Sequence, residues 1–154
     1  MPNTYTQIYL QLIFAVRYRE AQIKPEWKQQ FQQYTTGIIQ ENKHKLIQIN
    51  SLLDHVHIFL CLNPNQSLSD LVQSVKTETS KWIKTVQTPT EKPFFWQHGF
   101  GAFSHGHREF DDVIRFVQNQ GKTHEQQSFL EEYQMLLKAY KIPFEQAYIF
   151  KELE

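Results

Sequence analysis

The segment HKLIQINSLLDHVHIFLCL, residues 44–62, decides the fold. Its two parts, 44–50 and 53–62, are short β-like segments separated by a break, and they are close enough to pair as a hairpin. Residues two apart in a strand point to the same side, so His55 and His57 share one face while their neighbours enter a core. The segment therefore predicts a β-hairpin that carries two imidazoles on one face.

Working outward, hydrophobic spacing and capping signals predict the remaining elements. They are, in chain order, a strand over 5–16, a helix over 25–42, a helix over 68–84 capped by Ser67, a strand in the second half of 94–104, a helix from 109 to 120 and a helix over 126–140. The order β-α-β-β-α-β-α-α indicates an α+β fold: a ferredoxin-like antiparallel sheet with helices packed on one face.

Composition supports one globular domain spanning residues 1–154. The chain is 40% hydrophobic and 14% aromatic, which is enough for one core. Its 16 Lys and Arg balance 16 Asp and Glu, which excludes a histone-like binder of nucleic acid but leaves room for a local basic groove. Residues 1–53 hold six basic against three acidic side chains, and residues 125–154 hold three against six. A polyanion should prefer the first two thirds, unless this is ordinary surface scatter.

Cysteine content and the first residues bear on location. The single cysteine, Cys61, permits neither an internal disulfide nor a cysteine-based zinc site. The first apolar stretch follows no basic region, and Thr6, Gln7 and Gln11 interrupt it. It fits neither a signal peptide nor a membrane span, so we expect a cytoplasmic protein.

Two histidines on a rigid strand form half of a divalent-metal site. His55 and His57 supply two nitrogens, and a third ligand must come from elsewhere; two ordinary surface histidines are the alternative. Phe116 and Gln120 are four residues apart, so they share one helix face, and Gln120 offers an amide oxygen. An amphipathic helix with a polar end explains that pair equally well. A second His-x-His pattern, His105-Gly106-His107, contains Gly and is therefore expected in a loop near the site.

Four ordered motifs carry a resemblance to a known family: DHVHIFL at 54–60, SLSDLVQSVKTETSKWI at 67–83, WQHGFGAFS at 96–104 and VIRFVQNQ at 113–120. Together they resemble the single-tyrosine HUH transposases of the insertion-sequence and REP-associated type. The resemblance spans nearly the whole chain. It implies a DNA-nicking and strand-transfer enzyme acting on single-stranded or hairpin DNA.

The resemblance also implies a site. His55, His57 and Gln120 match the residues that bind Mg²⁺ or Mn²⁺, which polarises a scissile phosphate in single-stranded DNA. In the family, a helix tyrosine one turn before the glutamine attacks the phosphorus, forms a 5′-phosphotyrosine and releases a 3′-OH.

The nucleophile position departs from the family, because Phe116 stands there and has no hydroxyl. Three interpretations remain: a change made to trap a complex, a decayed copy, or a domesticated DNA-binding protein. If the site is otherwise intact, Phe116→Tyr should restore nicking. The functional alternatives are a transposase-like enzyme, a cleavage-dead binder of DNA hairpins, and a metal-binding α+β protein unrelated to nucleic acid.

Partners follow from the surface and from the resemblance. The expected DNA contacts, with a solvated helix face as the alternative, are Arg17, Arg19, Lys76, Lys81, Trp82 and Lys84, with Phe95 as a second stacking candidate. A homodimer is expected because the long apolar strand at 5–16 would leave an exposed edge. Resembling family members often merge sheets into dimers, although the REP-associated branch works as monomers.

Overall fold

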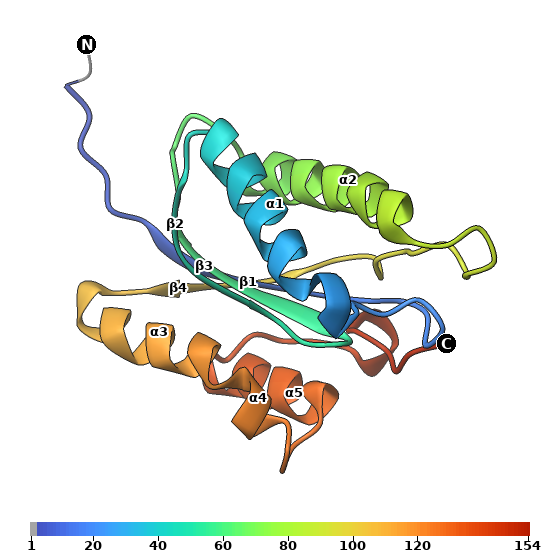
Figure 1. Cartoon of the computed structure of the whole chain (residues 1–154). Coiled ribbons are helices and arrows are strands. Elements are labelled where there is room, and N and C mark those ends of the chain that lie inside the picture. The colour runs from blue at the N-terminus through green and yellow to red at the C-terminus, as the bar shows by residue number, and fades with distance from the viewer. Residues whose placement is uncertain (1–2) are drawn as a thin grey trace.

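A four-stranded antiparallel sheet lies between two layers of helices (Figure 1). The structure is a computed structural model that describes residues 3–154. The strand order is β2-β3-β1-β4. The helices and strands, in chain order, are β1 (Tyr9–Ala15), η1 (Pro25–Trp27), α1 (Lys28–Glu41), β2 (Lys45–Ser51), β3 (His55–Cys61), α2 (Leu68–Val86), β4 (Gly101–His105), η2 (His107–Glu109), α3 (Phe110–Gln118), α4 (Gln120–Thr123), α5 (Phe129–Ala139) and η3 (Gln146–Tyr148). The predicted α+β class and β-hairpin are confirmed.

The first strand is central rather than peripheral. β1 pairs with β3 on one side and with β4 on the other. All its residues after Tyr9 are buried, which is typical of a strand covered on both faces. The prediction of an exposed edge at 5–16 is therefore wrong, and the physical argument for a homodimer loses its basis.

The prediction that helices cover only one face is also wrong. α1 and α2 pack on one face, and α3, α4 and α5 cover the other (Figure 1). The reason lies in β3, where the alternation that sends Val56 into the main core turns Phe59 to the opposite face. Phe59 is buried there in a small second cluster with Val113 and Val117 of α3.

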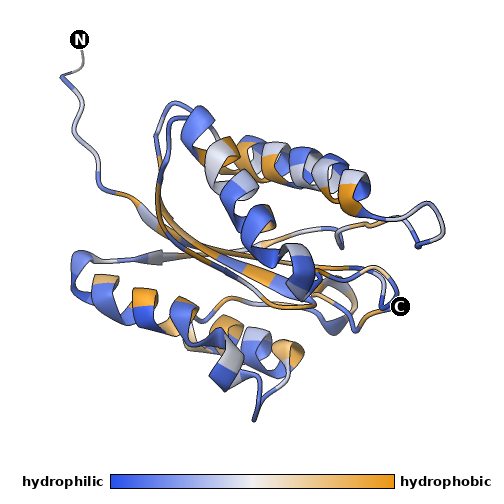
Figure 2. Cartoon of the chain, in the orientation of Figure 1, coloured by the Kyte–Doolittle hydropathy of each residue, from blue (hydrophilic) through white to orange (hydrophobic). Residues whose placement is uncertain are grey.

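The main core fills the space between the sheet and helices α1 and α2, and it also includes Phe129, Tyr133 and Leu137 of α5. Val56, Ile58 and Leu60 of β3 are fully buried in it, and the strands are largely apolar in Figure 2. α2 begins where predicted, because the Ser67 hydroxyl accepts a hydrogen bond from the Asp70 amide. This core fixes β3, and with it the two histidines on its other face.

The C-terminal helices differ in their bounds from the expectation. The predicted helix over 109–120 breaks at Asn119, so Gln120 starts the separate short helix α4. α5 begins at Phe129 because the Ser128 hydroxyl accepts from the Glu131 amide. The break turns α4 toward the sheet. Within residues 3–154 no helix is both long and apolar enough to cross a membrane.

α5 packs against the sheet at a position without a side chain. A Cβ at Gly101 of β4 would lie 2.7 Å from the ring and hydroxyl of Tyr133. Phe150, from the end of the chain, packs on the other side of that ring at 4.7 Å between centroids. Gly101 thus admits the ring that holds α5 close to the sheet.

Candidate functional site

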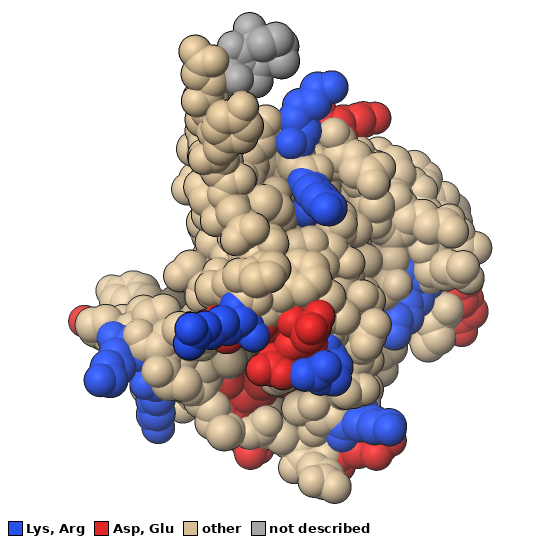
Figure 3. Space-filling view, turned by 90° about the vertical axis from the view of Figure 1, so that its left-hand side faces the viewer, with Lys and Arg blue, Asp and Glu red and all other residues tan. Residues whose placement is uncertain are grey.

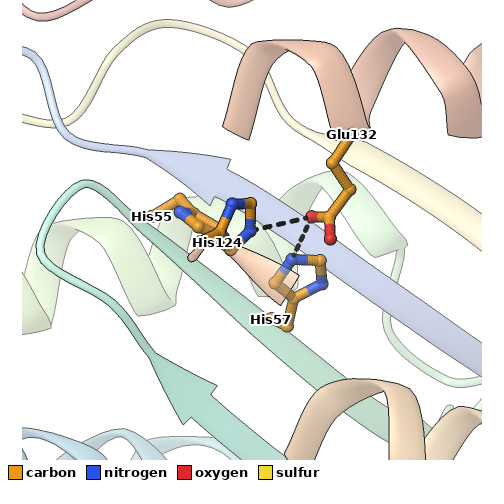
Figure 4. A group of neighbouring side chains, drawn as sticks. All are labelled: His55, His57, His124 and Glu132. Carbon is orange, nitrogen blue, oxygen red and sulfur yellow. Dashed lines mark hydrogen bonds and ion pairs between the residues drawn. The ribbon is translucent and has the colours of Figure 1, made fainter. Parts of the chain in front are cut away.

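The site is a buried polar cluster between the sheet and the C-terminal helices. His55 and His57 of β3 are both fully buried, and their ring centroids are 5.1 Å apart. α4 brings Gln120, His124 follows at its C-terminal end, and α5 brings Glu132. Figure 4 shows the three imidazoles and the carboxylate converging on one point.

Hydrogen-bond distances join all five side chains. His57 Nε2 lies 3.1 Å from Glu132 Oε1, and His55 Nε2 lies 3.1 Å from Gln120 Oε1. His124 Nε2 is 2.8 Å from Gln120 Oε1 and 3.4 Å from Glu132 Oε1. The Gln120 amide donates to Glu132 Oε2 at 2.9 Å. The structure thus brings together the three predicted ligands His55, His57 and Gln120. It adds two further side chains that can ligate a metal, His124 and Glu132.

Burial and charge set the protonation of this cluster. Burial lowers the pKa of His57 to about 4, so its ring is neutral near pH 7. Burial alone would raise the pKa of Glu132, but hydrogen bonds from His124 and His57 outweigh it and hold that pKa well below its usual value. Burial would likewise lower the pKa of His124, but its bond to Glu132 raises it. Glu132 is therefore an ionised carboxylate inside the fold.

Phe116 lies next to the histidine pair. Its ring meets the His57 ring edge-on, with centroids 5.5 Å apart and planes at 81°. Its carbonyl is 3.5 Å from the Gln120 amide nitrogen, one turn further along the chain. The phenyl ring at the position where the resemblance implies a tyrosine therefore lies beside the imidazoles, and it offers no oxygen.

Tyrosines from α5 and its C-terminal end are held elsewhere. The Tyr133 ring is buried against Phe103 and Phe150. The Tyr140 hydroxyl donates to His105 Nδ1 at 3.2 Å. Neither hydroxyl bonds to the imidazoles of the cluster.

His105 belongs to a strand, and not to a loop as predicted. It ends β4, and its Nε2 donates to Gln11 Oε1 of β1 at 3.1 Å. The Gln11 amide in turn donates to His57 Nδ1 at 3.2 Å. A chain of hydrogen bonds thus runs from Tyr140 at the surface through His105 and Gln11 to the buried His57.

Sequence reasoning missed Asp54, Gln11, His124 and Glu132. Asp54 directly precedes His55, and its carboxylate accepts from His55 Nδ1 at 2.7 Å. His124 lies four residues after Gln120, which is the helical spacing that could have signalled a shared face. Gln11 and Glu132 gave no local signal, because only the tertiary fold brings them near.

The predicted DNA contacts on α2 lie on the opposite face of the sheet from the cluster (Figure 1). Lys76 donates to the backbone carbonyls of Gln97 and Gly99 at 2.9 and 2.6 Å, and burial lowers its pKa to about 8. The Lys81 ammonium is exposed and lies 3.7 Å from the exposed Glu78 carboxylate, and the Lys84 ammonium lies 4.7 Å from the centroid of the partly exposed Phe95 ring. Lys76 therefore ties α2 to the segment before β4, while Lys81 and Lys84 face solvent.

Trp82 and the two arginines have different surroundings. The Trp82 ring stacks on Tyr34 of α1 at 5.7 Å between centroids. Arg17 pairs with Glu154 at 3.2 Å. Arg19 lines a cavity of about 370 Å³ that Asp54 also borders. Figure 3 shows Lys and Arg interleaved with acidic side chains on the face it views, so that face carries no continuous basic patch.

Comparison with known proteins agrees with this arrangement. Residues 4–120 match the family described as transposase IS200 like. A crystal structure of a candidate transposase from Deinococcus radiodurans R1 is similar with a TM-score of 0.60 and 17% identity, covering 78% of this chain and 95% of that one. A REP-associated tyrosine transposase bound to a REP hairpin is similar with a TM-score of 0.59 and 11% identity, covering 80% of this chain and 73% of that one. The curated proteins give no match.

The family match over residues 4–120 thus makes this a transposase-like protein. The family match covers most of the chain, and the chain belongs to the IS200-like transposase family. This is a metal-dependent family, and the cluster of His55, His57, His124 and Glu132 could hold a metal ion. His124 and Glu132 lie beyond the matched residues 4–120.

Proposed function

We propose that this protein binds hairpin or single-stranded DNA and does not cleave it. The observation that carries this proposal is the phenyl ring of Phe116, 5.5 Å from the His57 ring and without a hydroxyl. A phosphotyrosine intermediate needs an oxygen nucleophile one turn before Gln120, and this side chain supplies none. Membership of a transposase family and likeness to a hairpin-bound transposase support DNA as the partner.

The donor atoms at the site suit a divalent cation. Imidazole nitrogens from His55 and His57 would hold the ion. The Mg²⁺ or Mn²⁺ that the resemblance implies, with Gln120 as third ligand, would polarise a phosphate only if positions on it stayed open, and His124 and Glu132 lie where they would fill those positions. The residues themselves do the rest: Asp54 orients His55 through Nδ1, and Gln11 orients His57.

The DNA would lie across two regions of the surface. Arg19 at the cavity beside Asp54 is placed to contact a phosphate near the histidine cluster. Lys81 and Lys84 extend from α2 on the other face, where Trp82 offers a ring for stacking. To contact both regions, one DNA molecule has to pass around the edge of the β-sheet. A DNA hairpin with a single-stranded flank can do this. Arg17 and Lys76, already paired within the protein, contribute less.

A labelled hairpin oligonucleotide with a single-stranded flank tests the proposal. Fluorescence anisotropy measures binding, and denaturing gel electrophoresis of the same samples with Mn²⁺ detects a covalent protein–DNA adduct. We expect salt-sensitive binding and no adduct. An adduct would show another nucleophile and a working enzyme, and failure to bind any hairpin would reject the DNA partner.

A matched pair of double variants locates the contact. Lys81→Ala with Lys84→Ala should flatten the slope of log affinity against log salt by about two, because each phosphate contact contributes about one. Lys122→Ala with Lys138→Ala removes the same charge from exposed positions on the other helical layer and should leave the slope nearly unchanged. Equal effects of the two pairs would contradict a contact on α2.

Assembly and location complete the proposal. The edge-strand argument for a homodimer no longer applies, so a dimer would rest on other surfaces, and light scattering of the 18.5 kDa chain decides it. A cytoplasmic location stays part of the proposal, and fractionation of cells tests it directly.

A further inference from the structure

The cluster presents more metal-binding atoms than the three residues that the family uses. His124 and Glu132 turn their Nε2 and Oε1 atoms toward the same point as His55 and His57, and the four ligand atoms all lie within 4.8 Å of one another. Neither additional residue belongs to the segment that matches the family. The chemistry of this point therefore has to be derived from this chain alone.

Hydrogen bonds to the outer ring nitrogens fix the direction of two imidazoles. His55 Nδ1 faces the Asp54 carboxylate at 2.7 Å, and His124 Nδ1 faces the Gln127 carbonyl at 2.7 Å. A carboxylate and a carbonyl only accept, so both Nδ1 atoms carry the proton. In its neutral form, each ring would direct the lone pair of Nε2 inward, which is the usual arrangement of a metal-bound histidine.

His57 can also adopt the form that carries its proton on Nδ1, through a change in the hydrogen bonds around it. The Gln11 amide now donates to His57 Nδ1. A half-turn of that amide would present its oxygen to His57, which could then carry its proton on Nδ1 and release Nε2. The amide nitrogen would then face His105, whose proton would move from Nε2 to Nδ1 and bond to the Tyr140 hydroxyl oxygen. Each proton moves within one neutral ring, and no net charge is created.

The inward-facing nitrogen and oxygen atoms lie close enough together to compete for protons. Gln120 Oε1 lies 3.1 Å from His55 Nε2 and 2.8 Å from His124 Nε2, where neutral rings would place lone pairs against each other. Two buried imidazolium rings, with centroids 4.7 Å apart, would remove this conflict at the expense of burying like charges side by side. One divalent cation satisfies all these acceptors at once.

The two spacings measured from Glu132 Oε1 suit four-coordinate zinc, and the remaining ligand atoms, all within 4.8 Å, would close around the ion. Zinc–nitrogen bonds of about 2.0–2.1 Å give a tetrahedron with edges of about 3.3 Å. Glu132 Oε1 lies 3.1 Å from His57 Nε2 and 3.4 Å from His124 Nε2. Mg²⁺ instead prefers six oxygen ligands and keeps several waters, whereas three of the four ligand atoms here are imidazole nitrogens.

Charge and enclosure agree with the same ion. One Zn²⁺ is neutralised by the carboxylates of Glu132 and Asp54. Phe129 stacks on His55 with centroids 4.1 Å apart, and Phe116 covers His57. The aromatic rings shield the cluster from water.

We propose that His55, His57, His124 and Glu132 form a closed four-ligand Zn²⁺ site that joins α4 and α5 to the sheet. Gln120 becomes a neighbour of the ion that hydrogen-bonds to Glu132. All four positions around the ion are occupied by protein, so none is left for a DNA phosphate. This site is independent of whether the chain binds DNA.

Metal binding by the purified chain, without DNA, tests the proposal. The chain is stripped with a chelator and titrated with Zn²⁺ against a chromophoric indicator. We expect one ion per chain, preference for Zn²⁺ over Mg²⁺, and a rise in melting temperature on the order of 10 °C at a thousandfold excess over the dissociation constant. Substitution by Co²⁺ should give the intense visible absorption of a four-coordinate ion.

Single substitutions assign the ligands. Glu132→Gln and His124→Ala should each weaken Zn²⁺ binding by on the order of a hundredfold or more, since even residues beyond the ligands contribute up to that amount. Glu131→Gln and His98→Ala, at exposed positions, are the matched controls and should bind as the unmodified chain does. Absence of Zn²⁺ binding, a six-coordinate Co²⁺ spectrum, or full affinity in both ligand variants would overturn the proposal.

Discussion

Removal of the Glu132 carboxylate should destabilise the metal-free protein strongly. The carboxylate accepts from His57 Nε2 at 3.1 Å and from the Gln120 amide at 2.9 Å, and both donor side chains are fully buried. Glu132→Ala leaves these donors without a partner, and each unsatisfied buried donor costs about 1–3 kcal/mol. We therefore expect a loss of about 3 kcal/mol in the free energy of unfolding.

Thermal and urea denaturation in the presence of a chelator measures this loss. For a chain of this length about 3 kcal/mol corresponds to a fall of about 6–12 °C in melting temperature. Glu131→Ala is the matched control, because Glu131 is exposed on the same helix and should lose well under about 1 kcal/mol. Equal stability of the two variants would refute the view that the carboxylate holds α5 to the histidines.

Two further substitutions test the site and its support. Phe116→Tyr should bind hairpin DNA as the unmodified chain does and still give no covalent adduct on a denaturing gel, because His124 and Glu132 occupy the remaining coordination positions of the ion. An adduct would show that the site is open and that the phenyl ring alone prevents cleavage. Gly101→Ala should lower the free energy of unfolding by about 1–3 kcal/mol in urea denaturation, since the new methyl would lie 2.7 Å from the buried Tyr133 ring, and unchanged stability would mean that α5 shifts freely.

The fold could be predicted where the sequence carries local signals. The period-two pattern of β3 placed His55 and His57 on one face, and Ser67 marked the start of α2. The position of β1 could not be predicted in the same way, because an apolar strand is consistent with an edge or with the centre of a sheet. Its pairing with β4 depends on a contact between residues about 90 apart in the chain.

The site could be predicted only in part, for a related reason. Gln120 was identified as a candidate ligand through the family resemblance, because its helical spacing to Phe116 alone is explained by an amphipathic helix. Glu132 reaches the cluster through the docking of α5, which depends on the space above Gly101 and on the aromatic residues around Tyr133. Nothing in the local sequence distinguishes Glu132 from its exposed neighbour Glu131.

The divergence of this chain from the family's mechanism involves more than one position. If Phe116 were the only difference, the remaining groups would still form an open site of two imidazoles and an amide. Instead, Gln120 Oε1 meets His124 Nε2 at 2.8 Å, and Glu132 engages His57. A helix that binds DNA for cleavage has to expose the ion to the phosphate, whereas α4 and α5 bury the point where the ion would lie. Loss of the hydroxyl and enclosure of the ligands act in the same direction, toward a protein that retains the family's fold and uses the histidine pair to hold that fold together.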